Sequence, residues 1–215
     1  AELVTNSIKE RGEGVIGVGF GTDNIENSYS KLKKLGYFVS DITDGEGIDE
    51  TNKKIRKWRN LFLPDELTRG LFSFIIEHTD GILPNQEKYH AASINKLDHV
   101  VINTNDADGF INIYKEVFNI RLALDKVIEH WKSRMLFFRL NKTTIEVIER
   151  KDDKDTKDSL WGLAWEVESI EDTHKRLSTE GVEVSSIKKG LKENTLVATI
   201  KSHTHNVPTL LIEHI

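Results

Sequence analysis

The stretch LDHVVINTNDADGFINIYKEVFN, residues 97–119, decides the fold of this chain. Its opening residues alternate as the side chains of a β-strand do, so His99 and Val101 share one face. Asn105 or Asp106 can then cap a helix. The apolar residues of that helix recur at helical spacing, at Phe110, Ile113, Tyr114, Val117 and Phe118. A strand that carries a histidine is therefore followed at once by an amphipathic helix.

The order of one strand, one helix and three further strands is predicted three times along the chain, which indicates an internal repeat. The rounds cover residues 14–79, 97–150 and 160–215. The closest echo joins FIIEH (74–78) with LLIEH (210–214), each of which ends the last strand of its round. Residues 82–96 contain Pro, Asn, Gln and Ser without periodicity, so they read as a linker.

The composition is that of an ordinary globular protein. The 215 residues include 30% charged and 38% hydrophobic residues, and the net charge is only −5. Mixed charges of this size argue against nucleic acid or an anionic membrane as the main partner. The absence of cysteine excludes disulfides, thiolate metal sites and cysteine nucleophiles. No apolar run is long enough for a membrane span or a signal peptide, which favours a cytoplasmic protein.

Three segments carry a resemblance to a known superfamily. LDHVVINTNDADGFINIYKEVFNIRLALDK (97–126) resembles the opening of a domain of the vicinal-oxygen-chelate superfamily, which includes glyoxalases, bleomycin-resistance proteins and dioxygenases. GLKENTLVATIKSHTHNVPTLLIEH (190–214) resembles the closing strands of a glyoxalase-like subgroup, and GEGVIGVGFGTDNIENSYSKLKKLGY (12–37) resembles the second unit of another glyoxalase-like domain. The resemblance implies an α+β fold of repeated βαβββ units, which form curved mixed sheets with helices on the convex side.

The same resemblance implies a division of the chain. Residues 97–215 would form one complete glyoxalase-like domain of two units, residues 82–96 a linker, and residues 1–81 a partial domain of one unit. The partner of that single unit would lie upstream or be supplied by another chain. A homodimer is therefore an open expectation.

In metal-using members of the superfamily, ligands sit on the first and last strands of each unit and face the concave side. By motif, these positions are His99, Glu146 and Glu213, with Gly162 at the fourth. Strand parity allows the first three to face inward, and one imidazole with two carboxylates suits Zn²⁺, Mn²⁺, Fe²⁺, Ni²⁺ or Mg²⁺. Glu146 and Glu213 are then the expected catalytic residues. The alternative is a metal-free His99 that donates to a neighbouring carboxylate.

Further candidates for substrate binding lie on HWKSRMLFFRL, residues 130–140. They are Trp131, Arg134, Phe137 and Arg139, since an arginine in an aromatic-lined hollow binds carboxylates or phosphates. By alternation, Arg139 and Phe137 share one face and Arg134 lies on the other. In the first round Gly17 replaces the histidine, and its single carboxylate, Glu77, is expected to pair with Arg56 or Arg59.

Two functions from different classes fit these residues. The first is a metal-dependent lyase or isomerase that removes a proton next to a carbonyl of a small oxygen-rich metabolite or toxic compound. The second is a metal-free protein that sequesters a small molecule, in the manner of bleomycin-resistance proteins. Dioxygenase activity is less expected because of Gly162. In both cases the partner is a small molecule.

Overall fold

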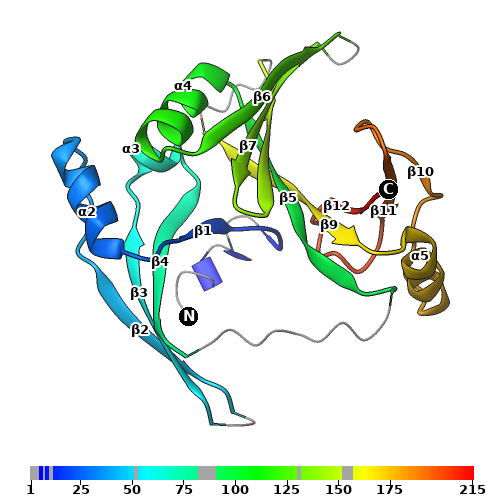
Figure 1. The fold of residues 1–215 in the computed structure, drawn as a ribbon, viewed down its shortest axis with the longest axis horizontal. Coiled ribbons are helices and arrows are strands. Elements are labelled where there is room, and N and C mark those ends of the chain that lie inside the picture. Colours follow the sequence, from blue (N-terminus) through cyan, green and yellow to red (C-terminus); the bar gives the residue numbers. More distant parts are fainter. Residues whose placement is uncertain are drawn as a thin grey trace. The chain divides into compact units, whose positions relative to one another are not determined.

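A computed structural model of the chain describes residues 5, 6, 8, 9, 12–50, 53–81, 91–129, 132–151 and 157–215. The fold divides into two compact units (Figure 1). One consists of Ile16–Gln86, and the other of Ala1–Val15 with Glu87–Ile215. Each has its own sheet, of four and eight strands respectively.

The eight-stranded sheet is built from two βαβββ halves that meet at its centre (Figure 1). The first half is β5 (Ile94–Thr104), α4 (Ala107–Ile111) with the π-helical turn η1 (Asn112–Val117), β6 (Arg121–Ile128), β7 (Ser133–Leu140) and β8 (Thr143–Glu149). The second is β9 (Ser159–Val167), α5 (Ile170–Thr179), β10 (Lys188–Lys189), β11 (Thr195–Ile200) and β12 (Thr209–His214). The strand order is β10-β11-β12-β9-β5-β8-β7-β6. The predicted α+β class and the two repeats within this part are confirmed.

The pairing of the strands makes the two halves equivalent. β5 and β9, the first strands of the halves, pair antiparallel with each other at the centre of the sheet. β8 then pairs parallel with β5, and β12 pairs parallel with β9. Each last strand therefore lies beside its own first strand, which brings residues far apart in the sequence into one row.

The helices begin where the sequence predicts, after Asn105 or Asp106 and at the start of IEDTHKRLSTEG (170–181), because each is preceded by a side chain that accepts a backbone N–H. Asp106 caps α4 by accepting from Gly109 N at 2.9 Å, and Ser169 caps α5 by accepting from Asp172 N at 3.2 Å. Both helices cover the convex side of the sheet. On that side Phe110, Tyr114 and Phe138 pack as fully buried rings.

The unit Ile16–Gln86 contains β1 (Gly17–Gly21), α2 (Ile25–Lys34), β2 (Thr43–Ile48), β3 (Ile55–Phe62), α3 (Asp65–Thr68) and β4 (Phe72–Asp80). Its sheet order is β1-β4-β3-β2. Asn24 caps α2 by accepting from Asn27 N at 2.8 Å. Gly17 is packed closely, since a Cβ there would meet the carbonyl oxygen of Phe72 at 2.6 Å. This round of the repeat is confirmed as well.

Three boundaries differ from the sequence prediction, in which one strand begins at Leu97, another is YFVSDITDG (37–45) and a third is VEVSSIK (182–188). β5 begins at Ile94, inside the predicted linker, because β9 extends far enough to pair with it. β2 begins at Thr43, since the preceding YFVSDI (37–42) has no ladder partner among the described residues. In VEVSSIK (182–188) the one ladder contact of the described backbone before β10 is a bridge from Val184 to Ile200.

In the part of the chain that the structure describes, no helix has both the length and the apolar character needed to cross a bilayer.

Candidate functional site

The concave face of the eight-stranded sheet carries two rows of side chains that include most of the predicted site. In one row Thr144 of β8 lies between His99 of β5 and Arg139 of β7. Arg139 Nη1 donates to Thr144 Oγ1 at 2.7 Å. The row therefore places an imidazole and a guanidinium on either side of Thr144, whose hydroxyl accepts from the guanidinium.

In the next row Glu146 of β8 lies between Val101 of β5 and Phe137 of β7. Val101 belongs to a small apolar cluster with Met135 and Ile148, against which Phe137 packs. Glu146 thus stands among apolar neighbours on the face that also carries His99. The prediction that these two residues lie together, from different strands, agrees with the structure.

His99 is held between two carboxylates. Its Nδ1 lies 2.8 Å from Asp98 Oδ2, and its Nε2 lies 3.5 Å from Glu146 Oε2. Because an ionised carboxylate only accepts, Nδ1 carries the proton that bonds to Asp98 and Nε2 faces Glu146. The alternative contact, a histidine donating to a neighbouring carboxylate, is therefore present. It coexists with the approach of Glu146.

The two carboxylates are tuned in opposite directions. Burial raises the pKa of Glu146, and the nearby charge of His99 lowers it by a smaller amount. Burial also raises the pKa of Asp98, but hydrogen bonds from His99 and His214 outweigh it and lower the pKa well below its usual range. A proton acceptor beside a permanently charged carboxylate is an arrangement typical of acid–base chemistry.

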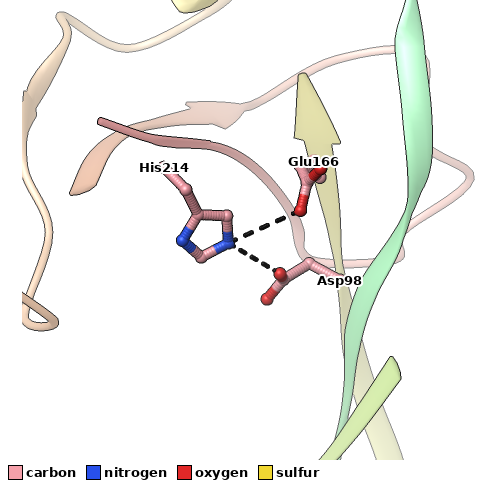
Figure 2. A group of neighbouring side chains, drawn as sticks. All are labelled: Asp98, Glu166 and His214. Atoms are coloured by element: carbon pink, nitrogen blue, oxygen red, sulfur yellow. Dashed lines mark hydrogen bonds and ion pairs between the residues drawn. The ribbon is translucent and has the colours of Figure 1, made fainter. Parts of the chain in front are cut away.

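Asp98 also connects this pair to a second group of side chains, shown in Figure 2. His214 Nε2, at the end of β12, lies 2.8 Å from Asp98 Oδ1 and 3.7 Å from Glu166 Oε2 on β9. Lys96 Nζ lies 3.0 Å from the same Glu166 oxygen. One ligating atom each from Asp98, Glu166 and His214 lies within 4.8 Å of the others, so the three form a group that could hold a metal ion.

Glu213 does not join this site. Its Oε2 accepts a hydrogen bond from the backbone N of Ile170 at 2.7 Å, at the start of α5. Leu211, on the same side of β12, lies in the buried cluster under that helix. The prediction that Glu213 faces the concave side is therefore wrong. Its carboxylate lies on the convex side, because there it accepts a hydrogen bond from a backbone N–H group at the helix start.

The repeat explains the misplacement. In the first half of the domain, Glu149 Oε1 accepts from the backbone N of Ala107, the first residue of α4, at 3.3 Å. Glu213 is thus the equivalent of Glu149 and not of Glu146. The true equivalent of Glu146 is Leu210, because Leu210 pairs with Ala164 as Glu146 pairs with Val101. Both partner residues precede their helices by the same six residues.

The metal centre that the resemblance implies does not fit these residues. Two of its four positions, His99 and Glu146, carry ligands, whereas Gly162 and Leu210 carry none. Gly162 is also closed to a larger residue, since a Cβ there would lie 2.7 Å from the carbonyl oxygen of Pro208. A histidine at this position would require the chain before β12 to move.

The remaining predicted residues separate by strand face. Phe137 and Arg139 lie on the concave face as expected. Arg134 does not, because its guanidinium binds Asp125 at 2.7 and 2.8 Å and Asp108 of α4 at 2.8 Å. Trp131 lies outside the described residues.

In the unit Ile16–Gln86, the expected pairing of Glu77 with a basic residue is confirmed for one of the two candidates. Arg59 Nη1 lies 3.8 Å from Glu77 Oε2. Arg59 also pairs with Glu26 and, at 3.9 Å, with Asp44 Oδ1, which raises the pKa of its guanidinium, mainly through the hydrogen bond to Glu26. Its positive charge is therefore already shared among three carboxylates.

Sequence reasoning missed two residues of the site, Asp98 and His214. Strict alternation puts Asp98 on the opposite face from His99, but the ladder of β5 shifts between Leu97 and His99. Such irregularities turn neighbouring side chains to the same side. Glu166 has the same strand parity as Gly162, so alternation places it on the face of Gly162, either as a base or as a strand-edge residue, and it lies on that face.

Comparisons with known proteins agree with the superfamily resemblance of the sequence. A model of the Glyoxalase-like domain matches residues 1–118, and one of the Glyoxalase/Bleomycin resistance protein/Dioxygenase superfamily matches residues 98–199. The chain is similar to a methylmalonyl-CoA epimerase from Mycobacterium tuberculosis, with a TM-score of 0.51 and 19% identity over 60% of this chain and 93% of that one. It is also similar to a methylmalonyl-CoA epimerase from Streptomyces coelicolor, with a TM-score of 0.47 and 17% identity over 56% of this chain and 98% of that one. No curated protein matches.

Proposed function

Because this chain belongs to the glyoxalase, or vicinal-oxygen-chelate, superfamily, we propose that it is an isomerase or lyase that removes a proton next to a carbonyl. The proposed substrate is a small molecule that carries both the carbonyl and a negatively charged group. The observation that supports this most is the approach of His99 Nε2 to Glu146 Oε2, at 3.5 Å, on the concave face of the sheet.

Glu146 is the proposed base. A general base works best when its pKa is close to the working pH. Burial raises the pKa of a carboxyl group toward neutral pH. Burial raises the pKa of Glu146, so its carboxylate accepts a proton from carbon more readily than an exposed one would. Phe137 and Val101 beside it keep the reacting carbon in apolar surroundings.

His99 is the proposed acid for the carbonyl oxygen. As the proton moves from carbon to Glu146, the C–H electron pair shifts into the carbonyl and negative charge collects on its oxygen. His99, protonated on both nitrogens, can donate from Nε2 to that oxygen while Asp98 accepts from Nδ1 at 2.8 Å. Return of the proton from Glu146 to another carbon of the delocalised enol gives an isomer, and loss of a neighbouring group gives a lyase product.

Arg139 is the proposed anchor for the negative charge of the substrate. It is exposed, and it binds Thr144, which lies next to His99 in the ladder. A guanidinium there can hold a carboxylate or phosphate in two hydrogen bonds. A substrate fixed at Arg139 would extend its carbonyl along the row toward His99. Simple sequestration is less well supported, because it needs no paired acid and base.

Proton exchange tests the proposal directly. The purified protein is incubated in D₂O with methylmalonyl-CoA, the compound that the similar epimerases are named for, and separately with pyruvate and 2-oxobutyrate. Loss of the proton next to the carbonyl is followed by NMR. We expect catalysed exchange of at least one probe and, for Glu146→Gln, a loss of about a hundredfold or more.

Two variants provide the controls. Arg139→Met is expected to raise KM with little change in kcat, since it removes only an anchor. Glu183→Gln changes an exposed glutamate that pairs with Lys201 at 3.3 Å, and it should leave exchange unchanged. Exchange that persists in Glu146→Gln, or no exchange with any of the three probes, would contradict the proposal.

A further inference from the structure

Asp98, Glu166 and His214 bring three ligating side chains together from three neighbouring strands. They come from β5, β9 and β12, which meet at the centre of the sheet, and one imidazole nitrogen faces both carboxylates in Figure 2. His214 Nε2 lies 2.8 Å from Asp98 Oδ1 and 3.7 Å from Glu166 Oε2. None of the three occupies a position at which the superfamily resemblance implies a ligand.

These spacings suit a small divalent ion. Bonds of about 2.0–2.2 Å to nitrogen and oxygen place the donor atoms of neighbouring ligands about 3–3.5 Å apart. The two observed distances lie on either side of that range. A small rotation of the Glu166 and His214 side chains would therefore allow one ion to touch all three, with its Nε2 bond replacing the present proton.

Charge at the site also favours a cation. The connected side chains contain three carboxylates, those of Asp98, Glu146 and Glu166, and one lysine, Lys96. Even with His99 protonated, as the proposed reaction requires, this leaves an excess of about one negative charge. The side chains of Asp98 and Glu166 are only 15% and 22% exposed, so solvent screens that excess incompletely.

We propose that Asp98, Glu166 and His214 bind one divalent cation of the type that accepts mixed imidazole and carboxylate ligands, such as Mn²⁺ or Zn²⁺. The site lies beside the superfamily position and not in it. Asp98 is shared, because its second oxygen accepts from His99. Binding of the ion would thus act on the proposed acid–base pair through this one carboxylate, although the site itself does not depend on the proposed reaction.

The test measures binding of the metal alone. Mn²⁺ is titrated into the purified full chain, and free Mn²⁺ is followed by electron paramagnetic resonance, with Zn²⁺ as a competitor. We expect one saturable site per chain that Zn²⁺ displaces. Asp98→Asn, Glu166→Gln and His214→Gln should each weaken binding at least about tenfold.

Matched controls separate this site from general binding to surface histidines and carboxylates. His203→Gln and Glu183→Gln change the same residue types at exposed positions outside the group and should leave the affinity unchanged. Lys96→Met removes the lysine that competes for Glu166 and should tighten binding several-fold. Far-UV circular dichroism and the thermal midpoint verify that each variant is folded.

The absence of saturable Mn²⁺ binding would overturn the proposal, as would an affinity that survives both Asp98→Asn and His214→Gln. Equal losses in the control variants would overturn it as well. Because the readout is binding, failure of this site is distinguished from failure of the proposed reaction, which is judged by proton exchange.

Discussion

Substitution of Glu213 distinguishes its structural role from the ligand role that the sequence suggests. Its carboxylate accepts from Ile170 N at 2.7 Å and stabilises the start of α5. A hydrogen bond to a charged acceptor contributes about 1.5–3 kcal/mol, and loss of a helix-capping acceptor costs about 0.5–2 kcal/mol. Because Glu213 is half-buried and water replaces part of the bond, we expect Glu213→Ala to cost about 1.5 kcal/mol.

This cost translates into a measurable melting shift. A cooperative unit of about 120 residues has an unfolding entropy of about 0.25 kcal/mol per kelvin, so 1.5 kcal/mol lowers Tm by about 6 °C. Glu213→Gln keeps an acceptor and should lose about a third of that. Differential scanning calorimetry and urea unfolding provide the two measurements, while Mn²⁺ binding and proton exchange should remain as in the parent protein.

The control is Glu193→Ala, which removes an exposed glutamate from the turn before β11 and should change the free energy of unfolding by less than about 0.5 kcal/mol. A Glu213→Ala variant with unchanged Tm would refute the capping role. Loss of Mn²⁺ binding in folded Glu213→Gln would refute the assignment of Glu213 to the convex side.

Three further predictions follow from single contacts. Gly162→Ala should cost about 1–3 kcal/mol in urea unfolding, because its Cβ would lie 2.7 Å from the Pro208 oxygen, and an unchanged midpoint would contradict this close approach. Burial raises the pKa of Glu146, so the folded state holds this proton more tightly than the unfolded chain does. The resulting contribution to the free energy of unfolding is complete below the pKa of glutamate in the unfolded chain, about 4.3, and is lost as pH rises through the pKa in the folded state. Glu146→Gln should therefore gain stability relative to the parent between pH 4 and pH 7, and a constant difference in Tm would argue against it. Arg134→Met should lose at most about 1 kcal/mol, since its pairs with Asp125 are partly exposed, and should keep KM for any exchanged probe, whereas a raised KM would return Arg134 to the substrate site.

Local patterns were sufficient for much of the fold. The helix caps at Asp106 and Ser169 are short-range contacts within three residues, so they can be read from the order of residue types. Alternation along one strand likewise predicts that Phe137 and Arg139 share a face. The same reasoning placed His99 and Glu146 correctly, because the strands that carry them are regular where they pair with each other.

Alternation alone does not determine which of the two faces of a strand lies on the concave side of the sheet. Long-range contacts determine this. For β12 the choice is made by the start of α5, which binds Glu213 on the convex side and leaves His214 on the other. Glu213, which the sequence suggested as a ligand, instead accepts from the start of a helix, as Glu149 does in the first half of the domain, whereas Glu77 in the matching ending FIIEH lies near Arg59. A match in sequence between repeats identified an equivalence but not its purpose.

The sequence by itself determined the repeated βαβββ order, the helix starts and the presence of a histidine and a glutamate on one face, because each depends on residues close together in the chain. Tertiary structure decided which other side chains meet them. The ladder shift in β5 turns Asp98 beside His99, and parallel pairing of β9 with β12 brings Glu166 near His214. These contacts depend on the register between distant strands, which alternation within a single strand does not determine.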